Sequence, residues 1–352
     1  MSNRYAIALA GALGAACFAA LTLTGQTPAP RSKSGSTAAA KVSAGTAGAV
    51  PRTAWGVPDL QGTWFVLYDV PLERSAANAG KEFLTDEEIA AADSKKGINP
   101  GRNARSADKE QDVSGAYNAV FNSVLKTGRR TSMIIDPPDG RIPPLAPGAK
   151  EPPNPFGRGR STAQVLGIAA GVNDNPETVP QSPRCLGVPM PFLPLNTLFA
   201  QGTVMQVVQS PKSLGIYMED DHAGGGNRVI YMDGRPHAPA KLKFYLGDSR
   251  GHWEGNTLVV ETTNFSQGFR GSNIETYKMI EHFTRVNATT LRRDITFDDP
   301  KTWSKPWTVT IEMGRAPDDR HMIFDSACHE GNYGMTGILV GTRREEQAAG
   351  KK

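Results

Sequence analysis

The densest group of side chains that could do chemistry lies near the C-terminus, in the sequence ACHEGNYG, which contains His329, Glu330, Asn332 and Tyr333. A histidine beside a carboxylate can act as a general acid and base near neutral pH. Adjacent residues on a strand point to opposite faces, so His329 and Glu330 share one site only if the glycine-rich turn breaks the strand. The sequence leaves two interpretations open: a catalytic pair, or a turn whose side chains form hydrogen bonds.

A second group occurs in the sequence DGRPH, which begins at Asp233. Asp233, Arg235 and His237 could orient a polar group of a substrate, although Asp-Gly is also a common tight turn. We predict that His237 acts in catalysis together with His329 and Glu330. The predicted substrate-binding residues are His222, Asp233, Arg235, Asn332 and Tyr333.

The histidines also raise the question of a metal. His222 lies in a glycine-rich stretch shortly before His237, so these two and His329 could meet at one rim and bind zinc. None of the three has the i, i+2 or i, i+4 spacing of familiar zinc motifs. The sequence also has no phosphate loop, dinucleotide fingerprint or haem-attachment motif. We expect no cofactor, and zinc is the alternative.

The N-terminal residues predict export. Arg4 is followed by an uncharged, mostly apolar stretch over 6–23, which is the pattern of a secretory signal peptide. This stretch is short and weakly apolar for a permanent anchor, which needs about 20 strongly apolar residues. We predict a signal peptide at 1–25, a flexible linker of small residues at 26–51, and a periplasmic or secreted protein that is not integral to the membrane after cleavage.

Two cysteines follow the predicted signal peptide, Cys185 and Cys328. In an oxidising compartment they can form a single disulfide, and the alternatives are two buried free thiols or a catalytic thiol. Cys185 lies in a stretch rich in proline and glycine at 137–194. We expect a disulfide that ties this Pro-rich arm to the region of His329.

Short runs rich in Val, Ile, Thr, Tyr and Phe recur along the C-terminal half and are separated by turn residues. An antiparallel meander of this length tends to close, because closure removes the exposed strand edges. We predict a mainly β fold in which the meander forms a lipocalin-like barrel, with a two-sheet sandwich as the alternative. The predicted strands are 204–209, 214–219, 228–232, 241–246, 251–254, 257–262, 277–286, 290–297, 307–313, 322–327 and 337–342.

The N-terminal half is predicted to carry a short helix. Thr85 is a good N-cap and Glu88 completes a capping box, and strands are expected at 62–68 and 132–136. The predicted organisation is an N-terminal segment with the Pro-rich arm at 52–200, a barrel region of the same domain at 201–344, and a disordered tail at 345–352.

Several long motifs resemble a large family of exported, mostly uncharacterised bacterial proteins. They include RTSMIIDPPDGRIP at 130–143, GDSRGHWEGNTLVVETTNF at 247–265 and ACHEGNYG at 327–334, and the resemblance covers about 58–344. The resemblance supports the fold boundaries and the candidate site, and it brings no established reaction.

The sequence supports three hypotheses about function. The leading one is an exported enzyme that acts on a small, partly apolar organic molecule held in the barrel, by hydrolysis, elimination or isomerisation. The second is a binding protein for a hydrophobic small molecule, and the third is a scaffold with a filled barrel. Nucleic acid is not an expected partner, because 39 basic and 35 acidic residues nearly balance and no basic cluster stands out.

Overall fold

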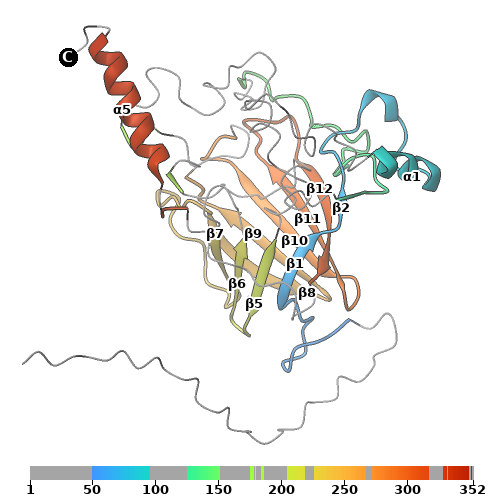
Figure 1. Cartoon of the computed structure of the whole chain (residues 1–352). Helices are drawn as coiled ribbons and strands as arrows, with labels where there is room; N and C mark the ends of the chain where they lie inside the picture. Colours follow the sequence, from blue (N-terminus) through green and yellow to red (C-terminus); the bar gives the residue numbers. More distant parts are fainter. Residues whose placement is uncertain are drawn as a thin grey trace, which may run out of the picture. The chain divides into compact units, whose positions relative to one another are not determined.

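Nine strands form a closed barrel in the computed structural model (Figure 1). The structure describes residues 50–95, 125–150, 175–177, 179, 184–185, 204–218, 226–266, 272–316, 328–330, 332–348 and 350. The predicted signal peptide, most of the linker, His222, the predicted strand at 322–327 and much of the Pro-rich arm lie outside these residues. The barrel strands are β1 (Gly62–Val66), β5 (Met205–Gln209), β6 (Ser213–Met218), β7 (Gly226–Tyr231), β8 (Asp248–Glu254), β9 (Thr257–Thr263), β10 (Lys278–Arg285), β11 (Thr290–Asp298) and β12 (Trp307–Arg315).

Closure of the barrel depends on β1, which comes from the N-terminal half of the chain. Trp64 of β1 lies opposite Met205 of β5 on one side and opposite Arg315 of β12 on the other. The barrel prediction is therefore confirmed, and the sandwich alternative is wrong. The first half of β12 has a different partner, β4 (Ile134–Asp136), which pairs at Thr308 and Val309. Two short strands thus share one edge of β12.

The meander is not antiparallel throughout, because β7 and β8 run parallel, with Ile230 opposite Ser249. Parallel neighbours need a crossover connection, and residues 232–247 provide it. The strand predicted at 241–246 is therefore wrong: this stretch consists of turns, with one isolated bridge between Phe244 and Phe265. Of the apolar residues that favoured a strand there, Leu242 and Phe244 are exposed and only Leu246 packs against the core.

The barrel interior is a continuous apolar core with a few buried charges. In β10 every second residue is buried from Met279 to Arg285, and β11 follows the same alternation. The Phe297 and Trp307 rings stack across neighbouring strands with centroids 4.1 Å apart. The fully or nearly fully buried side chains include Trp64, Met205, Val207, Leu214, Ile216, Ile230, Leu258, Val260, Met279, Phe283, Leu291, Ile295, Val309 and Ile311.

One end of the barrel is filled by the segment that precedes β1. The Nε1 of Trp64 donates to the carbonyl of Leu60 at 2.9 Å, and the backbone N–H of Leu60 donates to Oε1 of Gln209 at 2.8 Å. The Arg285 guanidinium lies 5.1 Å from the Trp64 ring centroid and donates to the carbonyls of Asp59 and Ala288. These bonds satisfy buried polar groups and close this end with side chains.

The predicted N-terminal helix is confirmed as α1 (Asp86–Lys95). The backbone N–H of Glu88 donates to Oγ1 of Thr85 at 3.3 Å, and that of Thr85 donates to Oε2 of Glu88 at 2.8 Å, so the capping box forms. The end of α1 is joined to β3 (Lys126–Thr127), because the Thr127 N–H donates to Oδ1 of Asp93 at 2.7 Å. Strand β3 pairs in parallel with β2 (Tyr68–Asp69), which follows β1 directly, and a short 3-10 helix, η1 (Ala76–Asn78), lies between β2 and α1.

The C-terminal prediction needs correction. A strand was expected at 337–342 and a disordered tail from 345, but α5 spans Tyr333–Ala348. A short apolar run such as Ile338–Val340 does not distinguish strand from helix by its periodicity. The helix-forming residues that follow extend it, and Arg343 pairs with Glu346 at 2.9 Å one turn away. Among the described residues, no helix is long and apolar enough to cross a membrane.

Replacement of Gly247 by alanine is expected to destabilise the barrel more than the same change at Gly234. Both glycines have φ near the left-handed region, +73° and +76°, so they share the conformational cost. A Cβ on Gly247 would lie 2.5 Å from Cγ2 of Thr262 and 2.7 Å from the Phe265 ring, whereas Gly234 has nothing within 4 Å.

The added cost of overpacking is about 1–3 kcal/mol, to be measured as the difference in free energy of unfolding between the two variants in urea. Equal free energies of unfolding for Gly247→Ala and Gly234→Ala would contradict this prediction. They would show that Thr262 and Phe265 move to accommodate the added Cβ at no energetic cost.

Candidate functional site

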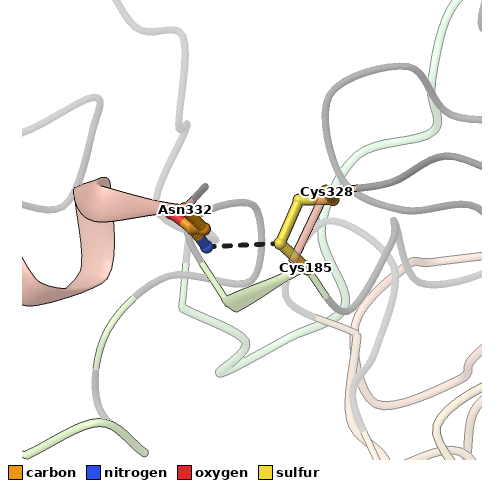
Figure 2. Close-up of a disulfide and its surroundings, with 3 residues drawn as sticks. All are labelled: Cys185, Cys328 and Asn332. Atoms are coloured by element: carbon orange, nitrogen blue, oxygen red, sulfur yellow. Dashed lines mark hydrogen bonds between the residues drawn. A yellow bond between two sulfur atoms is a disulfide. The ribbon is translucent and has the colours of Figure 1, made fainter. Parts of the chain in front are cut away.

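The disulfide prediction is confirmed, since Cys185 and Cys328 are bonded with their Cα atoms 5.6 Å apart. Figure 2 shows Asn332 beside this bond, where its Nδ2 donates to Sγ of Cys185 at 3.3 Å. The turn that carries the predicted catalytic pair is therefore attached to the Pro-rich arm. Its other side chains point to solvent: His329 and Glu330 are exposed, and Tyr333 is 83% exposed.

His237 lies elsewhere, between two carboxylates. Its Nδ1 is 3.1 Å from Oδ2 of Asp248 and its Nε2 is 3.3 Å from Oε1 of Glu261. Both ring nitrogens thus have carboxylate neighbours, and no hydrogen bond or ion pair within the described part of the chain joins His237 to His329. The arrangement attaches the β7–β8 crossover to strands β8 and β9.

Asp248 is the centre of this attachment. Its carboxylate accepts hydrogen bonds from the Ala238 N–H at 2.8 Å and from Nη1 of Arg250 at 2.6 Å. Burial raises the pKa of Asp248, but these two bonds and the one from His237 outweigh burial and leave the pKa below its ordinary value. Asp248 therefore stays ionised and holds His237 in place.

Asp233 and Arg235 bind each other across their turn. The Nε of Arg235 lies 2.9 Å from both carboxylate oxygens of Asp233, and this contact lowers the pKa of Asp233 to about 2. The Arg235 guanidinium also lies 4.1 Å from the Tyr231 ring centroid. Their role in substrate binding stays a prediction, as does that of Asn332 and Tyr333.

Within the described ranges, no group of three or more His, Cys, Asp or Glu is arranged to hold a metal. The zinc alternative involves His222, which lies outside these ranges.

A cavity of about 740 Å³ lies at the barrel wall and is lined by residues of β1, β11 and β12 and of the segment that contains β2, α1, β3 and β4; we term it the wall cavity. It borders the part of β12 where the partner changes from β4 to β1. Its apolar lining is Val66, Tyr68, Val70, Phe83, Ile89, Met133, Ile135 and Ile311. Its polar lining is Asp93, Lys126, Thr127, Arg129, Arg130, Arg292, Asp294, Thr310 and Glu312.

The charged groups at the wall cavity are largely paired. Arg130 contacts Glu82 at 2.9 Å, and Arg292 contacts Asp294 at 3.1 Å. Two buried polar atoms there, Oγ1 of Thr127 and Nε of Arg130, have no hydrogen-bond partner among the described residues. A buried polar group without a partner is destabilising, so these atoms favour a polar group of a bound molecule at this place.

Sequence reasoning missed the wall cavity. Its described lining comes from five separate stretches of the sequence, and none of them contains a local chemical motif. The only hint was Arg130, which begins one of the family-like motifs. The sequence placed a ligand inside the barrel, whereas the described cavity lies at the barrel wall, lined by core residues such as Ile311 and by outward residues such as Arg292.

Comparison with known proteins adds little to this geometry. No family model and no curated protein matches the chain. Among solved structures, a mutant of the fluorescent protein UnaG aligns with 39% of this chain and 86% of its own, at 10% identity and a TM-score of 0.22. A similarity this low carries no argument about fold or ligand.

Proposed function

We propose that this protein is exported and binds a small, partly apolar organic molecule in the wall cavity. The observation that carries the proposal is the cavity itself: about 740 Å³, with an apolar floor and a few charged and hydroxyl groups. Sites for small molecules are typically concave, mainly apolar, and about 300–1,000 Å³ in volume. The disulfide between Cys185 and Cys328 agrees with an oxidising compartment.

Binding takes precedence over catalysis in this proposal. None of the described residues that line the wall cavity is a histidine. His329 and Glu330 are exposed, and His237 has a carboxylate at each ring nitrogen. Acid–base catalysis by these residues stays a prediction, and turnover of an identified substrate by a His329→Ala variant is the measurement that would test it.

Phe83→Ala is expected to weaken binding of a neutral apolar dye. Phe83 lines the wall cavity and is 47% exposed, so its truncation removes a contact surface while leaving the buried core intact. We expect the Kd for Nile red, measured by fluorescence titration of the full chain, to rise about tenfold, which equals about 1.4 kcal/mol.

Val229→Ala is the matched control, because Val229 is 50% exposed on the outer face of β7 and does not line the wall cavity. Its Kd for the dye should equal that of the unmodified protein. The proposal fails if Phe83→Ala and Ile89→Ala both bind the dye as tightly as Val229→Ala.

A further inference from the structure

The two sulfurs of the disulfide have different surroundings. Cys185 is buried, with 8% of its surface exposed, whereas Cys328 is partly exposed and lies beside the exposed residues His329 and Glu330. Nδ2 of Asn332 donates to Sγ of Cys185 at 3.3 Å (Figure 2), and no hydrogen bond to Sγ of Cys328 is found within the described part of the chain. A thiol that reacts with this bond therefore meets two unequal sulfurs.

The amide of Asn332 is oriented by the helix that follows it. Asn332 immediately precedes α5, and at this position a side-chain oxygen typically accepts from the backbone N–H groups of the first turn. A Cβ added to Gly334 would lie 3.2 Å from Oδ1 of Asn332, so the amide oxygen lies against that first turn. With the oxygen directed at the helix, Nδ2 is the atom that faces the sulfur.

This environment favours a negative charge on Sγ of Cys185. A hydrogen bond stabilises a thiolate more than a disulfide sulfur, because bonds to charged groups are the stronger ones. The start of α5, a helix of 16 residues, adds to the effect because a helix N-terminus favours nearby anions. Cys185 also has φ +55°, in the left-handed region that is costly for a residue with a side chain, and separation from Cys328 removes one constraint on this conformation.

We propose that this disulfide is a thiol-exchange site for an external dithiol, in which Cys328 is attacked and Cys185 is the leaving group. The thiolate of the dithiol forms a bond with Sγ of Cys328 while the bond to Sγ of Cys185 breaks, and the electron pair stays on Cys185 beside the Asn332 amide. The second thiol of the reagent then attacks the mixed disulfide and releases Cys328 as a thiolate. The dithiol is oxidised, the protein is reduced by two electrons, and Cys185 is separated from the turn at 328–333.

The first test identifies the sulfur that is attacked. The full chain is incubated with reduced glutathione, free thiols are blocked with N-ethylmaleimide at early times, and the peptides are analysed by mass spectrometry. We expect glutathione on Cys328 and maleimide on Cys185 in most of the molecules that carry one of each. Glutathione mainly on Cys185, or on the two cysteines equally, overturns the proposal.

Asn332→Ser tests the stabilisation of the leaving group. Serine keeps an oxygen at the N-cap and adds no charge, but it removes the amide donor. The rate of reduction by dithiothreitol should fall about three- to tenfold, because the departing thiolate loses a charge-assisted hydrogen bond. A purely structural contact predicts the opposite sign, since its loss would expose the bond and accelerate reduction. An unchanged or faster rate is therefore incompatible with the proposal.

Asn256→Ser is the matched control. Asn256 lies in the exposed turn between β8 and β9, and its hydrogen-bond partner is Arg52. Its disulfide should be reduced at the rate of the unmodified protein, and equal slowing in both variants would also overturn the proposal. Neither cysteine is among the residues that line the wall cavity, so thiol exchange and dye binding can fail separately.

Discussion

Replacement of Glu281 by alanine is expected to lower the free energy of unfolding by about 3–5 kcal/mol, because it removes the carboxylate that two buried guanidinium groups contact. Glu281 is fully buried, with Arg228 and Arg293 as its ionic partners. Urea unfolding at neutral pH measures the loss. Glu254→Ala is the matched control: this glutamate also lies on a strand in an ion pair, with His252, but both side chains are 64% exposed. Exposed pairs contribute about 0–1 kcal/mol, so the control should be nearly neutral.

A compensated variant separates charge from packing. Glu281→Leu combined with Arg228→Met and Arg293→Leu removes all three charges and keeps apolar volume in the interior. Replacing a buried ionic group in this way is often neutral or stabilising by about 1–4 kcal/mol. If the triple variant is as unstable as Glu281→Ala, the loss comes from the deleted volume, and the electrostatic explanation is wrong.

The pH dependence gives an independent measurement of the same group. Burial raises the pKa of Glu281, but the charges of Arg228 and Arg293 outweigh burial and lower it below 4.5. A lowered native pKa means that the carboxylate stabilises the fold fully above 4.5 and loses this effect as pH falls through the native value. The difference in stability between the unmodified protein and Glu281→Ala should therefore narrow below pH 4.5 and be constant above it.

Part of this interior could be predicted from the sequence. Met279, Glu281, Phe283 and Arg285 alternate with outward residues along β10, so a glutamate at an inward position of an apolar strand is visible without a structure. The same alternation puts Arg293 inward between Leu291 and Ile295 on β11. The tight turn at 286–289 sets the register of the two strands, and it predicts a buried pair of opposite charges.

The other features could not be predicted because they depend on contacts between distant segments. Arg228 contacts Glu281 only because the barrel closes and brings β7 across from β10. The parallel pairing of β7 and β8 has no local signal, because Asp233-Gly234 is equally consistent with a hairpin. The wall cavity likewise depends on where β12 changes its partner. Local sequence patterns therefore predicted the strands and the helix cap. The candidate sites depend on how distant segments meet when the barrel closes, so they could not be predicted.

Removal of the disulfide by the double change Cys185→Ser and Cys328→Ser is expected to lower the free energy of unfolding by up to about 5 kcal/mol. The bond joins residues 143 apart in sequence, so it excludes a large share of the conformations of the unfolded chain. Asn332, which donates to Sγ of Cys185, should lose its attachment, and amide hydrogen exchange in the turn at 328–333 should accelerate.

Reductant provides the control for this last change. Dithiothreitol should destabilise the unmodified protein to the level of the double variant and leave the double variant itself unaffected, as measured by urea unfolding. Dye binding in the wall cavity should persist in the double variant, since neither cysteine is among the residues that line the cavity. Equal stability of the unmodified protein with and without reductant would show that the bond does not constrain the unfolded chain, and the Pro-rich arm would then be attached by its other contacts.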